Sequence, residues 1–456
     1  MKRDFSFYAD GNDTELIKRY ERYLNGKDNG YFDAEEIAQI IDYYLFRDQT
    51  HQSLQALKFG KKLHPNSNIL DVKNAKINLS LGRIKEAYQI ISEMIESDEE
   101  IILLKIELFL KMSMKKEANQ LVYRILTNEL EEKDVIADDI AIIFMGENLY
   151  ADAIKWLNIG LEFNPKNSIL LLDLAFCHEQ IDNPKEALII YEKAINTDPY
   201  NSSAWFNKGA LYFKQEDFGK ALECFDFATT IDENDELALL YKAHSLYQIK
   251  KWKEAKEHYM MLENSWLEKW QIDFFIADCL ENLDQTEEAL EYYFKSEKEM
   301  PNHYETLTGI AYCFLTLEEY QNALIYLDKA IKIDSELPDA WAYIGEVLME
   351  LEMYKEALIV FDKAISIEPM QSDVLLSMAT ICVELENFAL AKKYYELTYQ
   401  IDNSVENIEL MIATVAFYTE EYKDMLYYLQ LAENKDLNAT KKFLEMCPNA
   451  EKILKK

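Results

Sequence analysis

The feature that most constrains the fold is a residue pattern that returns every 34 positions. Nine blocks of this length fill residues 134–439 without a gap, and the block 202–235 shows the pattern most clearly. A unit this short cannot bury its own apolar surface, so neighbouring units must stack in a line. The sequence therefore predicts a linear array rather than three globular domains. One frame position carries alanine throughout most of the blocks: Ala153, Ala187, Ala221, Ala255, Ala289, Ala323, Ala357 and Ala391.

The same frame continues toward the N-terminus with less regularity. Residues 34–67 and 68–101 each fit one block. Around 99–133, a third block with Ala118 and Val122 fits only if the register slips by a residue or two. We therefore predict twelve repeats, three in 34–133 and nine in 134–439.

Each block has the pattern of two helices, because two apolar stripes at helical spacing flank a polar turn. The whole chain contains only 11 Gly and 8 Pro in 456 residues, which argues against sheets joined by tight turns. Small residues such as Gly209 and Gly345 would let paired backbones approach closely. Aromatic residues recur beside the turn within the repeat, where they would fill the space between successive pairs: Tyr150, Phe218, Trp252, Tyr320, Tyr354, Phe388 and Tyr422.

These blocks resemble the tetratricopeptide repeat, a helix-turn-helix unit of 34 residues. The resemblance covers roughly residues 34–439, and block 202–235 carries it with Trp205, Gly209 and Tyr212 in the first helix. It implies an all-α fold, a right-handed superhelical solenoid of about twelve tetratricopeptide repeats. Such a superhelix presents a long concave groove.

The two ends of the chain are expected to cap this array with polar surface. Residues 1–33 are predicted to be an acidic N-terminal segment that contains a capping helix at 13–24. Residues 440–456 are predicted to be a basic C-terminal capping helix or tail. The last block, 406–439, departs from the pattern as an end repeat should.

The charge of the chain bears on the class of partner. Lys and Arg number 48 against 83 Asp and Glu, which gives a formal net charge of −35. A surface of this sign repels phosphate backbones and anionic lipid headgroups, so neither nucleic acid nor membrane is an expected partner. Six scattered cysteines and an N-terminus without an apolar signal-peptide core favour a cytoplasmic protein.

Motifs that would indicate catalysis or metal binding are missing from the sequence. It contains no GxxxxGK[ST] loop, no GxGxxG, no HExxH and no CxxC pair. Cys177, Cys279 and Cys313 share one frame position and are interpreted as small buried residues, with reactive thiols as the alternative. We therefore predict a protein that is not an enzyme and has no cofactor and no metal site.

By the resemblance, frame positions 2, 5, 9, 12 and 13 of each first helix line the groove. These positions are not needed for the fold, so their residues describe the ligand. Rings would bury apolar groups of a peptide, and carboxylates would attract its Lys or Arg residues. The predicted partner is therefore a protein or peptide segment with apolar and basic residues. The predicted groove residues are Phe176, Glu179, Phe206, Phe213, Leu240, His244, Tyr247, Phe274, Asp278, Glu281, Tyr312 and Glu346.

Other interpretations of the groove positions stay open. Some of these rings could pack between adjacent first helices, and the acids could be ordinary solvated residues. The chain could also be a structural subunit of a larger assembly, or associate with itself through its outer face or ends. The family's carboxylate clamp for acidic chaperone tails is not expected, because its Lys, Arg and Asn positions hold residues such as Asp138 and Leu172.

Block 236–269 departs furthest from the repeat pattern within the array. It carries Leu262 where neighbouring blocks have alanine, and two indoles, Trp266 and Trp270, lie around its exit. We interpret it as a locally altered angle between repeats, with both indoles filling the resulting gap. The alternative is a bulge or hinge that binds a partner.

Overall fold

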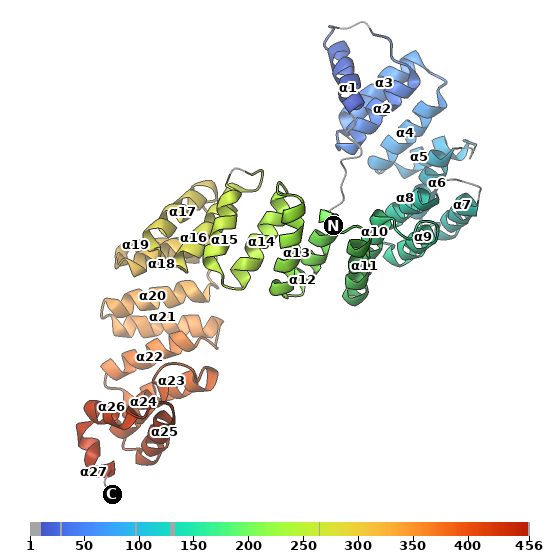
Figure 1. Ribbon diagram of the computed structural model, residues 1–456. Helices are drawn as coiled ribbons and strands as arrows, with labels where there is room; N and C mark the ends of the chain where they lie inside the picture. The colour runs from blue at the N-terminus through green and yellow to red at the C-terminus, as the bar shows by residue number, and fades with distance from the viewer. Residues whose placement is uncertain (1–10, 28–29, 96–97, 128–132, 264, 455–456) are drawn as a thin grey trace. The chain divides into compact units, whose positions relative to one another are not determined.

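The computed structural model describes residues 11–27, 30–95, 98–127, 133–263 and 265–454. These residues form α-helices and one short 3-10 helix, and no strand occurs among them. The chain divides into two compact units, Met1–Ser245 and Leu246–Lys456. Within each unit, consecutive helix pairs lie side by side (Figure 1). The all-α repeat fold predicted from the sequence is confirmed.

Helices α2 to α25 alternate in sequence as the first and second helices of twelve repeats. The first unit contains α1 (Gly11–Leu24), α2 (Ala34–Phe46), α3 (Thr50–Leu63), α4 (Asn68–Ser80), α5 (Ile84–Ser92), α6 (Glu99–Lys111), α7 (Lys115–Thr127), α8 (Lys133–Gly146), α9 (Tyr150–Phe163), α10 (Ser168–Gln180), α11 (Pro184–Thr197), α12 (Ser202–Lys214), α13 (Phe218–Ile231) and most of α14 (Glu236–Gln248). The second unit contains α15 (Trp252–Met261), α16 (Lys269–Glu281), α17 (Thr286–Glu299), α18 (Tyr304–Thr316), α19 (Tyr320–Ile333), α20 (Pro338–Glu350), α21 (Tyr354–Ile367), α22 (Ser372–Glu384), α23 (Phe388–Ile401), α24 (Ile408–Tyr418), α25 (Tyr422–Lys435), α26 (Ala439–Met446), η2 (Pro448–Ala450) and α27 (Glu451–Leu454).

The turn inside each repeat contains one residue with left-handed backbone, which marks the register of the repeat. These residues are Asp48, Gly82, Ser113, Asn148, Asp182, Glu216, Lys250, Asp284, Glu318, Glu352, Glu386 and Glu420. The spacing is 34 from Asn148 onward, whereas it is 31 from Gly82 to Ser113 and 35 from Ser113 to Asn148. The irregular register expected near 99–133 is visible in these two intervals, which together are two residues shorter than two regular repeats.

Each such turn closes its first helix in the manner of a Schellman motif. After α20, the Glu352 amide donates to the Met349 carbonyl at 2.9 Å, and the Met353 amide donates to the Leu348 carbonyl at 2.8 Å. Glu352 has a φ of 58°. A residue with a Cβ is disfavoured in that region, where glycine is the usual choice. The repeats therefore tolerate a small backbone cost at their turns.

Glu352→Gly is expected to stabilise the second unit by about 0.5–1 kcal/mol, because glycine removes the Cβ from a left-handed position. Urea unfolding, followed by circular dichroism, measures this change. Glu356→Gly is the matched control, because it removes the same charge from the exposed first turn of α21. That control should lose about 1 kcal/mol. An equal loss of stability in both variants would contradict the view that Glu352 occupies a left-handed position that favours glycine.

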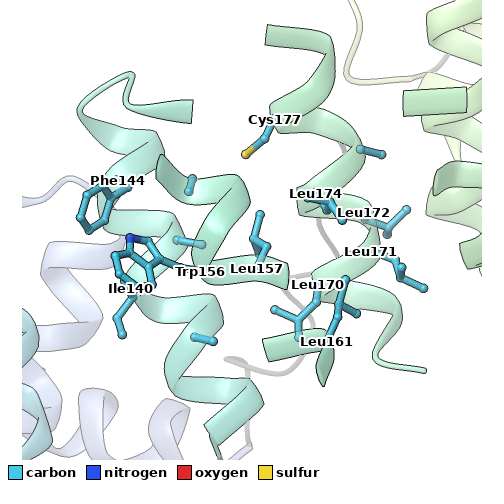
Figure 2. Packing of buried hydrophobic residues seen from close by; sticks show 14 of the residues in the cluster. Ile140, Phe144, Trp156, Leu157, Leu161, Leu170, Leu171, Leu172, Leu174 and Cys177 are labelled. Atoms are coloured by element: carbon cyan, nitrogen blue, oxygen red, sulfur yellow. The ribbon is translucent and has the colours of Figure 1, made fainter. Parts of the chain in front are cut away.

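The recurring alanines lie at the contact between paired helices. Ala153, Ala221 and Ala323 are completely buried, as are the other members of this set. Figure 2 shows the packing around one of these contacts, where Trp156 of α9 lies against α8 with its ring centroid 6.0 Å from that of Phe144. Small side chains at the contact leave room for such large ones beside it. The packing role predicted for the alanines is confirmed.

The recurring aromatic residues occupy the first position of the second helix in seven repeats. Two of them reach the following pair of helices. The Tyr150 ring lies 6.1 Å from that of Phe176 in α10, and the Phe388 ring stacks at 4.6 Å on Tyr418 in α24. At these positions the rings fill the space between successive repeats, as the sequence predicts.

Additional helices pack against the outer pairs of the array. Helix α1 covers the range 13–24 predicted to be helical, and its buried Tyr20 lies edge-on to Phe32 at 5.8 Å. Near the other end, Phe443 and Cys447 join the core cluster formed by α24 and α25. Residues 1–10 of the predicted N-terminal segment lie outside the described residues.

The block predicted to be irregular contains a short second helix, α15, with 10 residues. Leu262 ends this helix and is buried. Trp270 packs on His303 with ring centroids 4.7 Å apart, whereas the side chain of Trp266 is 75% exposed. The prediction that both indoles fill a gap is therefore wrong for Trp266, because most of that side chain is exposed to solvent.

Candidate functional site

Three consecutive first helices of the second unit, α16, α18 and α20, border a hollow of about 190 Å³. Contacts between α16 and α18 and between α18 and α20 place these helices next to one another. The hollow brings together four of the predicted groove residues, Phe274, Asp278, Glu281 and Tyr312. Its remaining lining residues are Tyr293, Tyr304, Glu305, Thr308, Gly309, Leu337, Pro338, Asp339, Ala340 and Tyr343.

The two acids of α16 are held in place by hydrogen bonds. The Tyr247 hydroxyl donates to Asp278, and the Asn282 amide donates to the same carboxylate at 2.9 Å. The Tyr293 hydroxyl donates to Glu281 Oε2 at 2.9 Å. These donors fix the orientation of both carboxylates and are themselves uncharged.

Burial weakens the ionisation of these acids. Desolvation raises the pKa of Glu281 to about 7, and the nearby Asp278 carboxylate adds to this effect. Desolvation also raises the pKa of Asp278 and of Glu346 above their ordinary values. No Lys or Arg forms a salt bridge with these three carboxylates in the part of the chain that the structure describes. A cation that enters the hollow would therefore stabilise the ionised form of these acids.

Aromatic rings form much of the wall. The rings of Tyr312 and Tyr343, on adjacent first helices, lie 5.3 Å apart. Phe274 lies 6.0 Å from Tyr293 and 5.1 Å from His303. Burial lowers the pKa of His303, which disfavours a competing positive charge on this imidazole.

Two other predicted residues lie next to the hollow without lining it. Tyr247 reaches it through its hydrogen bond to Asp278, and its ring packs 5.0 Å from Trp252. Glu346 is half-buried on α20, one helix turn after Tyr343, whose pKa it helps to raise. The structure therefore groups all six predicted residues of the second unit on α14, α16, α18 and α20.

The six predicted residues of the first unit lie on α10, α12 and α14. Phe176 and Leu240 are half-buried. Glu179 accepts a hydrogen bond from the Tyr191 hydroxyl, the same arrangement as Glu281 with Tyr293. Burial lowers the pKa of His244 to about 4, which leaves its ring neutral at pH 7.

Phe206 and Phe213 pack mainly against other rings of the first unit. Phe206 is only 5% exposed and lies in a core cluster, with ring centroids 5.7 Å from Phe225 and 5.6 Å from Tyr241. Phe213 lies 5.2 Å from Phe218 and 5.4 Å from Tyr241. The sequence left open the alternative that some groove rings pack between adjacent first helices. The contacts of both rings with Tyr241 on α14 agree with that alternative.

Sequence reasoning missed Gly309 and Tyr293. Gly309 stands at the frame position that holds Tyr241, Phe275 and Tyr343 in other repeats. The absence of an aromatic ring at this position is the sequence signal that could have pointed to Gly309. An added Cβ at Gly309 would lie 2.3 Å from Tyr293 Cζ, so the tyrosine crosses the glycine to reach Glu281. The Tyr293 ring thus takes the place of a side chain at Gly309, and both residues line the hollow.

A second hollow of about 530 Å³ lies over α4, α6 and α8 in the first unit. Its wall combines aliphatic residues such as Leu103 and Ile142 with several acids. One of these acids, Glu100, forms salt bridges with both Lys73 and Lys76. Lys73 and Lys76 thus neutralise part of the negative charge at this first-unit hollow. At the hollow of the second unit, Asp278 and Glu281 form no such salt bridge within the described residues.

The described residues include no helix with the length and apolar character needed to cross a membrane. All six cysteines are buried and unpaired. Burial raises the pKa of the Cys279 and Cys313 thiols to about 12, which keeps them protonated at neutral pH. This supports the prediction that they serve as small core residues.

Comparisons with known proteins agree with the helix-pair architecture. A family model described as tetratricopeptide repeat matches residues 202–235, and a second with the same description matches 304–337 and 338–369. The Hsp70-Hsp90 organizing protein of Triticum aestivum is 30% identical over 87 residues, which cover 19% of this chain and 15% of that protein. This chain thus matches only a small part of that relative.

Two solved structures are among those similar to this chain. The structure of YrrB, described as "a TPR protein with an unusual peptide-binding site", has 21% identity and a TM-score of 0.38, over 40% of this chain and 95% of that one. The APC/C hetero-tetramer Cut9-Hcn1 gives 13% identity and a TM-score of 0.44, over 90% of this chain and 97% of that one.

Proposed function

This chain belongs to the tetratricopeptide repeat family, and from that premise we propose that it is a non-catalytic scaffold that holds a protein segment against α16, α18 and α20 of the second unit. The segment carries apolar and basic residues. The observation that supports this most is the hollow of the second unit, where the half-buried Asp278 and Glu281 lie among aromatic rings and, within the described residues, form no salt bridge with a Lys or Arg. We also propose a cytoplasmic location, in line with the six free thiols.

The chemistry of this surface selects the class of segment. Rings such as Phe274 and Tyr312 offer apolar area and the negative face that attracts cations. Asp278 and Glu281 repel acidic segments, and so does the net charge of −35. The field of the whole chain speeds the encounter with basic segments and slows it as salt rises. Nucleic acid is repelled by the same field.

The test uses fluorescein-labelled 15-residue peptides and fluorescence anisotropy with the full chain. A peptide that alternates Leu and Lys is expected to bind, whereas Leu–Glu and Ser–Lys peptides are not. Binding should weaken steeply between about 50 and 500 mM NaCl, because screening shortens the reach of the acidic field. Binding of all three peptides alike, or of none, would contradict the proposal.

A pair of variants localises the binding to this surface. Tyr312→Ala with Glu346→Gln should weaken the Leu–Lys peptide by about tenfold, since a cation–π contact and an attractive charge are lost. Asp284→Asn with Glu318→Gln is the control, because both residues lie at exposed turns of the same unit. The control should leave affinity within about twofold.

An assembly subunit is the second candidate function, and an exposed apolar pair favours it. Ile325 on α19 and Ile359 on α21 occupy the same frame position and are 55% and 70% exposed. Neighbouring exposed apolar residues on second helices suit a contact with another subunit. Sedimentation velocity distinguishes the two candidates. Self-association that persists at high salt and is lost in Ile325→Lys supports assembly through this face.

A further inference from the structure

The hollow between α16, α18 and α20 has the dimensions of a pocket for one side chain. Its volume of about 190 Å³ lies below the range of roughly 300–1,000 Å³ found for pockets that hold whole small molecules. It opens at Gly309, where the repeats before and after carry the rings of Phe275 and Tyr343. The ring of Tyr293 crosses this glycine, and the space that remains beside it has the size of one side chain of a bound segment.

The walls combine two kinds of groups that favour the same guest. Five aromatic residues surround the space: Phe274, Tyr293, Tyr304, Tyr312 and Tyr343. Aromatic faces attract cations and also contact the methylene groups of a long side chain. A guest with an aliphatic stem and a cationic end makes use of both properties.

The charges of the wall are all of one sign. Four carboxylates border the hollow: Asp278, Glu281, Glu305 and Asp339. Glu305 lies 3.0 Å from the His303 imidazole, and burial lowers the pKa of that imidazole. The titratable groups that act on Glu281 or respond to it are Tyr247, Asp278, Tyr293, Tyr312, Cys313 and Tyr343, none of which carries positive charge.

These properties exclude other occupants. An anionic group would be repelled by the four carboxylates. A purely apolar side chain would remove water from Asp278 and Glu281 without replacing it, which is costly for buried polar groups. A cation removes that cost and gains contact with the rings.

We propose that this hollow is a specific pocket for one basic side chain, Lys or Arg, of the bound segment. The proposal rests on the proposed function. It adds the place on the scaffold that selects for a basic residue in the bound segment. The stem of the guest lies against the paired rings of Tyr312 and Tyr343, and its cationic end faces Asp278 and Glu281.

The experiment uses N-acetyl-lysine N-methylamide and its arginine counterpart as probes for the intact chain. Saturation-transfer NMR is expected to show saturable binding of one or both, with a dissociation constant on the order of millimolar for so small a ligand. The comparison of the two probes distinguishes Lys from Arg as the source of the cation. N-acetyl-norleucine N-methylamide, which keeps the stem without the charge, should bind at least about tenfold more weakly.

Two variants test the pocket by independent means. Glu281→Gln removes one charge and keeps an acceptor for the Tyr293 hydroxyl, and Thr308→Leu fills the space without changing charge. Each should weaken the cationic probe by about tenfold, whereas Asp284→Asn with Glu318→Gln should leave its affinity unchanged. The proposal would be overturned if the norleucine probe bound as tightly as the cationic probes. It would also be overturned if both pocket variants bound the cationic probe as tightly as the parent chain.

Failure of the pocket is distinguishable from failure of the proposed function. If Leu–Lys peptides bind the full chain while neither pocket variant affects the cationic probe, the scaffold function stands and the pocket is wrong. If the probe binds in the expected way while none of the peptides does, the pocket stands and the segment-binding function is wrong.

Discussion

Gly309→Ala is expected to destabilise the repeats formed by α16 to α19 by about 1–3 kcal/mol, the usual cost of forcing an extra carbon into a packed site. The new Cβ would lie 2.3 Å from Tyr293 Cζ and 2.7 Å from its hydroxyl oxygen. Tyr293 is buried and cannot move freely. Its displacement would also break the hydrogen bond to Glu281. The variant should therefore lose stability and probe binding together.

Thermal unfolding by calorimetry measures the loss of stability, and hydrogen exchange locates it in the sequence. Gly219→Ala in α13 is the control, because an added Cβ there meets no atom within 4 Å. That control should gain about 0.5–1 kcal/mol, since alanine is the better helix former. A Gly309 variant as stable as the control would mean that Tyr293 adapts without cost.

Raising the pH from about 5 to 8 is expected to destabilise the second unit, with Glu281 contributing roughly 2–3 kcal/mol of the loss. Burial raises the folded pKa of Glu281 from 4.5 to about 7. Between these values the folded state holds a proton that the unfolded chain has released, so stability falls as pH rises through this window. Asp278 and Glu346, whose pKa values are also raised, act in the same direction.

Comparison of the chain with Glu281→Gln separates this residue from the others. Gln cannot ionise, so the variant should match the parent near pH 4.5 and exceed its stability above pH 7. Urea unfolding at several pH values measures the difference. A difference that does not change between pH 5 and 8 would contradict the raised pKa. Addition of the lysine probe should lower the pKa of Glu281, because a cation favours its ionised form.

The groove residues were predicted with unequal success because frame position specifies only the direction of a side chain from its helix. At Asp278 and Tyr312 that direction leads to the hollow. At Phe206 it leads to Tyr241 and Phe225, which pack over the ring. Whether a ring at such a position lies free or covered depends on the size of its neighbours on the next first helix. The position of a residue within its own repeat does not indicate the size of that neighbouring side chain.

The sequence by itself determined the helix pairs, their register and their small contact residues, because spacing along one helix decides which side chains share a face. Ala221 and Tyr354 could be assigned to their roles on this basis alone. Only the tertiary structure decided that Tyr293 crosses Gly309 to bind Glu281 and that a hollow remains beside them. Those relations join three separate helices, so they depend on how closely repeats stack and how much water they exclude.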